Sequence, residues 1–183
     1  LANTTGTGNV AVGSGSLDAN TTGDYTVSVG RNALTAQTTG GNNTAVGDSA
    51  LAANTTASNN TAVGYGSLIA NTTGEYNVAV GATAGDALTT GSLNTAVGYN
   101  TLGVATTAAN NTALGGQALA VNTSGANNTA VGMNAMVANT TGAENTAVGA
   151  TAADAVTTAS SVTAIGYGAL GACTTGANNI AIG

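Results

Sequence analysis

A strict 17-residue repeat constrains the fold of this chain more than any other sequence feature. A glycine that closes an apolar tripeptide recurs every 17 residues, so that ten full repeats follow a 13-residue partial one and account for all 183 residues. These glycines are Gly13, Gly30, Gly47, Gly64, Gly81, Gly98, Gly115, Gly132, Gly149, Gly166 and Gly183. No residue is inserted or deleted, although surface loops of globular proteins tolerate such changes. The fixed period therefore predicts a solenoid over residues 1–183, in which each repeat is one coil stacked in register on the next.

Alternating apolar positions within each repeat predict two short strands. Counted from the residue after each closing glycine, the unit from Tyr65 to Gly81 reads YGSLIANTTGEYNVAVG. The fourth, sixth and eighth positions (here Leu68, Ala70 and Thr72) alternate like strand residues with one face turned inward. The fourteenth and sixteenth positions form a second strand, and the Gly and Thr content opposes helix. We therefore expect an all-β, parallel β-solenoid of eleven flattened coils, each with two tight turns.

The alternation also predicts which side chains fill the coils and which lie outside. The expected inward set includes Leu34, Leu51, Leu68, Val46, Val63, Val80 and Val97. The fifteenth position should then face outward, yet it is Ala in ten of eleven copies and Ser28 once. A column held small and apolar on an outer face predicts close packing against another chain, unless it reflects recent duplication of one unit. The candidate subunit interface comprises Ala45, Ala62, Ala79, Ala96, Ala113, Ala130 and Ala147.

The charge content narrows the possible functions. Charged residues amount to 4% of the chain, His is absent, and Arg31 is the single cation in a net charge of −6. Without His or Lys, the commonest general bases and amine nucleophiles are missing, and Ser or Thr would have no base to activate it. Binding of a nucleic-acid backbone needs clustered Lys and Arg. We therefore expect no enzyme activity, no cofactor and no nucleic-acid partner.

Metal binding and membrane insertion are also not expected. Asp18, Asp86 and Asp154 share the fifth repeat position, but successive members lie four coils apart, which is about 19 Å at the spacing of β-strands. Such acids cannot share a cation within one chain. No run of 18 apolar residues could span a bilayer. The chain begins at Leu1 in the middle of the pattern, as expected for a segment of a longer fibre.

The first repeat position varies most, which predicts that it forms the exposed face. Its candidate recognition residues are Arg31, Asp48, Tyr65, Tyr99 and Tyr167. The tyrosines could stack on sugars, mediate lateral contacts or simply cover turns. The asparagine that recurs before the second strand is expected to be structural, because its amide can hydrogen-bond along a stacked ladder.

Two sequence patterns resemble known fibre repeats. NNTAVG at Asn59 to Gly64 and NVAVG at Asn77 to Gly81 resemble the repeat of trimeric autotransporter adhesin heads. The unit NTAVGYGSLIANTTGEY, from Asn60 to Tyr76, is similar to repeats in phage tail-fibre proteins and related bacterial surface fibres. The resemblance covers the whole chain. It implies a left-handed parallel β-roll and a homotrimer with three chains packed around one axis.

Together these observations predict a structural or adhesive segment of an extracellular, cell-surface or virion fibre that presents a receptor-binding element. Its expected partners are further copies of the chain and a host-cell surface glycan or protein. The alternative is an ice-binding solenoid that uses ranks of Thr. The adjacent pair Thr72 and Thr73 argues partly against it, because neighbouring strand residues face opposite ways and only one Thr column would be outward.

Overall fold

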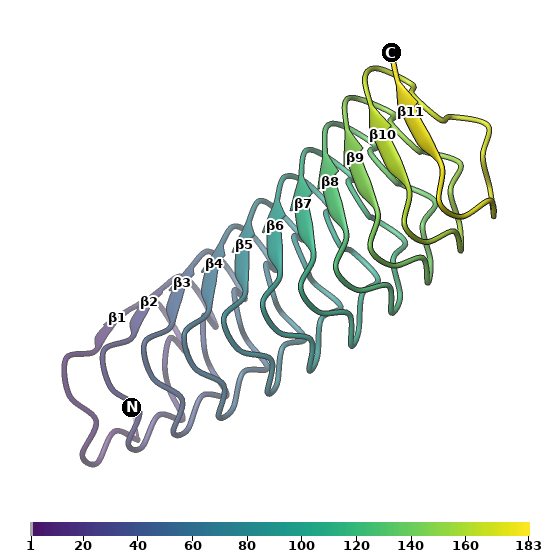
Figure 1. The fold of residues 1–183 in the computed structure, drawn as a ribbon. Coiled ribbons are helices and arrows are strands. Elements are labelled where there is room, and N and C mark those ends of the chain that lie inside the picture. Colours follow the sequence, from purple (N-terminus) through teal and green to yellow (C-terminus); the bar gives the residue numbers. More distant parts are fainter. Residues whose placement is uncertain (1) are drawn as a thin grey trace.

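A computed structural model describes residues 2–183, which form one continuous parallel β-solenoid (Figure 1). Eleven three-residue strands, one per coil, make a single parallel sheet in chain order. They are β1 (Val10–Val12), β2 (Val27–Val29), β3 (Thr44–Val46), β4 (Thr61–Val63), β5 (Val78–Val80), β6 (Thr95–Val97), β7 (Thr112–Leu114), β8 (Thr129–Val131), β9 (Thr146–Val148), β10 (Thr163–Ile165) and β11 (Ile180–Ile182).

The predicted solenoid and its period are confirmed. Residues paired between neighbouring strands lie 17 positions apart, as Ala62 and Ala79 do in β4 and β5. No helix occurs among residues 2–183, so this part of the chain also has no helix that could cross a membrane. The coils therefore stack into a rod whose long axis runs across the strands (Figure 1).

The wall opposite the sheet consists of consecutive turns and not of the additional strand that we predicted at the fourth, sixth and eighth positions. Residues 65–70 of one coil are turns, and Leu51 and Leu68 have φ angles of 52° and 49°. These values lie in the left-handed region, whereas strand residues have strongly negative φ. Hydrogen bonds still join the coils, since the Leu51 N–H donates to the Ser67 carbonyl at 3.0 Å. Of the predicted inward positions on this wall only the fourth is buried: Ala70 and Thr72 are half-buried, and Ser67 and Asn71 are buried instead.

The sheet register differs from the prediction by one residue. Leu34, Leu51 and Leu68 are fully buried, as expected. The four valines predicted to lie inside, Val46, Val63, Val80 and Val97, instead point outward, and Val46 and Val80 are each 37% exposed. The middle residue of each strand, which is Ser28 in β2 and alanine in the other ten, is the inward one. The physical reason is that leucines from the turn wall fill the thin coil, which leaves room for only a methyl group on the facing strand.

In two coils a small residue in one interior column is matched by a bulky apolar residue in another. Where the fourth position is glycine (Gly85), the seventh is the bulky Leu88, and where it is Ala153, the seventh is Val156. A Cβ added to Gly85 would lie only 3.0 Å from Leu88 Cδ1 and 3.1 Å from Leu68 Cδ2. Around Gly85 the two columns therefore share one space, and the bulky Leu88 requires the small residue beside it.

Buried asparagines at the thirteenth position tie successive coils together. The Asn77 N–H donates to Asn60 Oδ1 at 2.9 Å, and the Asn94 N–H donates to Asn77 Oδ1 at 3.0 Å. Asn77 Nδ2 also donates to the Gly91 carbonyl at 2.8 Å. The predicted structural role of these asparagines is confirmed by this ladder, which satisfies buried backbone groups where the chain enters most of the strands.

A second asparagine ladder, at the seventh position, stops where apolar residues replace the amide. Asn71 Nδ2 donates to Asn54 Oδ1 at 3.2 Å, but the next residue in the column is Leu88. Asn71 Oδ1 is consequently buried without a hydrogen-bond partner, as is Asn139 Oδ1 in the coil before Val156. Each Nδ2 in this ladder donates to the Oδ1 of the preceding coil. The last asparagine before an apolar residue therefore has no donor for its own Oδ1.

Candidate functional site

The described chain offers extended surfaces and no enclosed site. Residues 2–183 contain no pocket and no group of three or more His, Cys, Asp or Glu side chains that could hold a metal ion. The features that could contact another molecule are the outer face of the sheet, the two long edges beside it and the turn wall.

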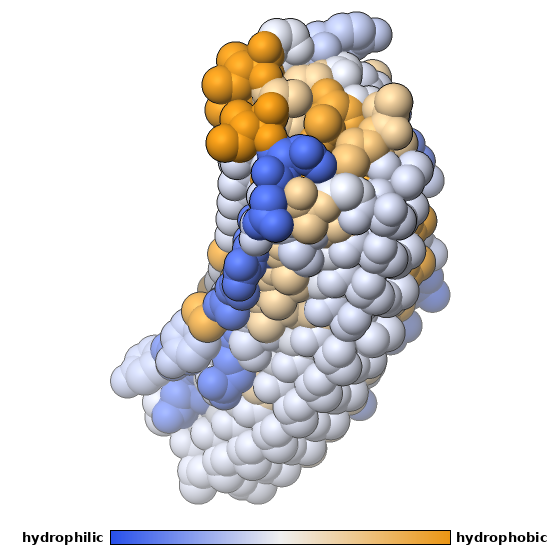
Figure 2. Space-filling view, turned by 45° about the vertical axis from the view of Figure 1, so that its right-hand side comes forward, coloured by the Kyte–Doolittle hydropathy of each residue, from blue (hydrophilic) through white to orange (hydrophobic). Residues whose placement is uncertain are grey.

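The outer face of the sheet carries a continuous apolar strip. The sixteenth repeat position contributes Val12, Val29, Val46, Val63, Val80, Val97, Leu114, Val131, Val148, Ile165 and Ile182, one from each strand. All are exposed or half-buried. Eleven coils at the usual strand spacing make this strip roughly 50 Å long. Figure 2 shows hydrophobic side chains gathered at the C-terminal end of the rod, where Ile180 and Ile182 of β11 are exposed.

A parallel column on the same face is mostly threonine. The fourteenth position is Thr44, Thr61, Thr95, Thr112, Thr129, Thr146 and Thr163, with Val or Ile in the other strands. The threonines of this column indicate from the sequence that the fourteenth position faces outward. A hydroxyl inside a dry, thin coil needs a hydrogen-bond partner, so threonine is better placed outside it.

The alanines that we predicted at a subunit interface lie inside the coil, which corrects that prediction. Ala45, Ala62, Ala79, Ala96, Ala113, Ala130 and Ala147 are all buried within a single chain. Their uniform small size follows from the limited interior volume and not from a neighbouring chain. Any packing of copies through the sheet must therefore use the valine strip and the threonine column.

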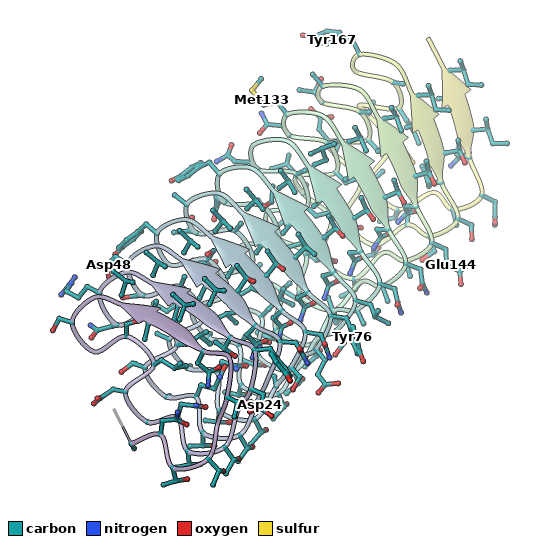
Figure 3. The ribbon with its side chains drawn as sticks, turned by 90° about the vertical axis from the view of Figure 1, so that its left-hand side faces the viewer. Asp24, Asp48, Tyr76, Met133, Glu144 and Tyr167 are labelled. Carbon is teal, nitrogen blue, oxygen red and sulfur yellow. The ribbon has the colours of Figure 1, made fainter. Side chains whose placement is uncertain are left out.

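The predicted recognition residues line one edge of the rod. Tyr65, Tyr99 and Tyr167 project into solvent, with Tyr167 82% exposed. Figure 3 shows Asp48 and Tyr167 on this edge together with Met133, an exposed residue that was not among the predicted recognition residues. Its signal was present, because Met133 occupies the same variable repeat position. The predicted exposure of this edge is confirmed, and its role in recognition stays a prediction.

The only basic residue of the chain is paired with an acid of the next coil. Arg31 Nη2 and Nε donate to Asp48 Oδ2 at 2.7 and 2.9 Å. The Ser49 hydroxyl, which donates to Asp48 Oδ1 at 2.7 Å, and the Arg31 guanidinium together hold the pKa of Asp48 below its ordinary value. This edge consequently has no unpaired positive charge to attract an anionic ligand.

The opposite edge carries its own aromatic side chains. Tyr25 and Tyr76 occupy the twelfth repeat position, with Leu93 in the same column, and all three are exposed. Figure 3 places Tyr76 with Asp24 and Glu144 along this second edge. They were not among the residues selected from the sequence, because the same repeat position is polar in most other coils and shows no apolar pattern.

The threonine pair considered for ice binding divides between two environments. Thr72 is half-buried, and its hydroxyl donates to the Thr89 carbonyl of the next coil at 3.1 Å. Thr73 is exposed. One threonine of the pair thus hydrogen-bonds to the next coil, and only the second belongs to an exposed column.

Asp86 is a half-buried acid with a raised pKa. Burial, which disfavours the carboxylate, raises the pKa of Asp86 above its ordinary value, and Oδ1 has no hydrogen-bond partner. The folded state therefore binds this proton more tightly than the unfolded state does. The stability that the protonated Asp86 carboxyl contributes is fully present below the unfolded-state pKa of about 3.9. It is lost as the pH rises through the raised folded-state pKa.

We expect Asp86→Asn to stabilise the solenoid at pH 7, because the amide occupies the same space without a charge. The gain should shrink toward zero near pH 3, where the wild-type carboxyl is protonated. Chemical denaturation of both proteins at the two pH values measures the difference in free energy of unfolding. A gain of equal size at both values would contradict the electrostatic explanation.

Searches of protein-family models, curated proteins and solved structures each found no match to this chain. The function is therefore inferred from the arrangement of its own residues.

Proposed function

We propose that this chain is a structural rod segment of an extracellular fibre, on a cell surface or a virion, formed by parallel copies that pack through the outer face of the sheet. The observation that carries the proposal is the apolar strip at the sixteenth repeat position, which continues through all eleven strands. Monomeric soluble proteins rarely expose a contiguous apolar surface of this length. Further copies of the chain have the same period, so they can cover the strip coil by coil.

The stacking of coils supports a mechanical role. Hydrogen bonds between successive coils run along both walls, as between the Thr61 N–H and the Asn77 carbonyl on the strand side and the Leu68 N–H and the Ala84 carbonyl on the turn side. Each coil is held by its neighbours, and stiffness needs neither charges nor disulfides. A homotrimer is the expected assembly, since the fibre repeats that the sequence resembles imply three chains around one axis. Such a rod would space or present a receptor-binding element.

The decisive experiment is sedimentation of the isolated chain and of a variant with a charged sheet face. The wild type should sediment as a trimer of about 51 kDa, three times the chain mass of 17.0 kDa. Val46→Glu with Val80→Glu should give folded monomers, because burying unpaired carboxylates at the interface opposes assembly. The matched control is Thr73→Glu, at an exposed position outside the sheet, which should leave the trimer intact. A wild-type monomer at all concentrations would overturn the proposal.

Ice binding is a second candidate function, and one observation favours it. The outward Thr and Val ranks, such as Thr61 and Val63, repeat at the strand spacing on a parallel sheet. They form a regular array of hydroxyl and methyl groups. Assembly would cover the same face, so the two functions exclude one another. Thermal hysteresis in a monomeric wild type, abolished by Thr61→Glu, would favour ice binding over the fibre.

A further inference from the structure

Large side chains occupy the first repeat position in every second coil. Arg31, Tyr65, Tyr99, Met133 and Tyr167 follow one another at intervals of 34 residues, and the coils between carry Ser14, Asp48, Ala82, Gly116 and Ala150. From Tyr65 onward the large residues are uncharged and exposed, from 59% at Met133 to 82% at Tyr167. We call Tyr65, Tyr99, Met133 and Tyr167 the edge column.

The backbone holds this column at a regular spacing. The Thr83 N–H donates to the Tyr65 carbonyl at 2.9 Å, and the Gln117 N–H donates to the Tyr99 carbonyl at the same distance. Each large residue is thereby anchored to the next coil through its own main chain. Two coils at the usual strand spacing separate neighbouring members by about 9.6 Å. The edge column is therefore a row of evenly spaced large side chains, which we call platforms, whose main chain is hydrogen-bonded to the next coil.

We propose that the edge column binds a neutral, extended β-1,4-linked polysaccharide chain. The spacing of its platforms is close to the length of one disaccharide unit in such a chain, so every second sugar would meet a large side chain. Tyrosine combines an apolar ring face, which packs on the C–H face of a sugar, with a hydroxyl that can hydrogen-bond to the sugar's own hydroxyls. Ala82, Gly116 and Ala150 leave clearance for the sugars between.

The lack of charge on the edge column and its small area favour a neutral polysaccharide over an acidic one or a second copy of the chain. The column from Tyr65 to Tyr167 contains no charged residue, and Arg31 beyond it is neutralised by Asp48. An acidic polysaccharide would find no cation here. A second copy of the chain is less well matched, because four separate side chains along seven coils offer far less than the area of a stable protein interface. The continuous valine strip on the sheet is the better surface for self-association.

The inference does not depend on the proposed fibre assembly, because the edge column lies beside the sheet face and not on it (Figure 3). It is tested by calorimetric titration of the full chain with cellobiose, cellotetraose and cellohexaose. Affinity should increase at least about tenfold from the disaccharide to the hexasaccharide, because a longer chain engages a second and third platform at once. Equal affinity for the three lengths, or no binding of cellohexaose at millimolar concentration, would overturn the proposal.

Variants test whether the edge column is responsible. Tyr65→Ala with Tyr99→Ala should reduce cellohexaose affinity roughly tenfold or more. The matched control is Tyr25→Ala with Tyr76→Ala, which removes two comparably exposed tyrosines from the opposite edge and should leave affinity unchanged. Equal losses in both pairs would contradict the assignment of the site.

A third variant tests whether binding depends on the two-coil spacing of the tyrosines or only on their number. Ala82→Tyr with Tyr99→Ala keeps the number of tyrosines but places two of them in adjacent coils. It should bind cellohexaose as weakly as the double alanine variant. Retained affinity would show that the two-coil spacing is irrelevant. Sedimentation of the same variants distinguishes this outcome from assembly: if only the oligomeric state changed, the edge column would be a contact between chains and the polysaccharide proposal would be wrong.

Discussion

Gly81→Ala should destabilise the solenoid by about 3–5 kcal/mol, enough to unfold a marginally stable chain. Two independent effects act at this position. Gly81 has a φ of +134°, a backbone conformation that residues with a Cβ rarely adopt. An added Cβ would also lie 2.5 Å from the Gly98 carbonyl oxygen and 2.7 Å from its carbon. Both atoms belong to the backbone of the next coil, so no flexible side chain can move aside.

Two further glycine variants separate these effects. Gly66→Ala encounters nothing closer than 4.0 Å but retains a φ of +62°, so it should cost only the conformational penalty of about 1–2 kcal/mol. Gly116→Ala meets no atom within 4 Å and should change the free energy of unfolding by less than about 0.5 kcal/mol. Urea denaturation measures all three. If Gly81→Ala were no more costly than Gly66→Ala, close contact between coils would not explain the invariant glycine column.

Asn77→Ala should destabilise the solenoid by about 3–5 kcal/mol through loss of buried hydrogen bonds. The side chain is fully buried. Its Nδ2 donates to the Gly91 carbonyl at 2.8 Å, and its Oδ1 accepts from the N–H and the Nδ2 of Asn94 at 3.0 and 3.1 Å. Alanine leaves the Gly91 carbonyl and the Asn94 N–H without these partners, in an interior where each unpaired polar group costs about 1–3 kcal/mol.

The matched control for Asn77→Ala is Thr73→Ala, an exposed polar residue in the same coil. It should alter the free energy of unfolding by less than about 0.5 kcal/mol. Hydrogen exchange adds a local measurement, because coils contact only their neighbours and protection should fall first in the coils around Asn77. A loss below about 1 kcal/mol would mean that water replaces the amide, and the ladder would then be dispensable.

The sequence alone determined the architecture of this protein. The glycine period specified one coil per 17 residues, and the buried positions of Leu34, Leu51 and Leu68 followed from their recurrence at one repeat position. The variable first position likewise predicted an exposed edge at Tyr65, Tyr99 and Tyr167. These features depend on periodicity, which stacking imposes on every repeat and which the sequence records directly.

Only the tertiary structure decided the form of the opposite wall, and it corrected the register of the sheet. Hydrophobic alternation could not say which face is inside where both faces are apolar, as at Ala79 between Val78 and Val80, although threonine at the fourteenth position of seven strands indicated the observed register. The leucines of the facing wall determine the register, because they fill the interior and leave room for only a small side chain from the strand. That wall is made of turns because Leu51 and Leu68 adopt positive φ, a choice enforced by hydrogen bonds between coils. Such contacts arise only after the coils have stacked, which is why no local pattern in the sequence could reveal them.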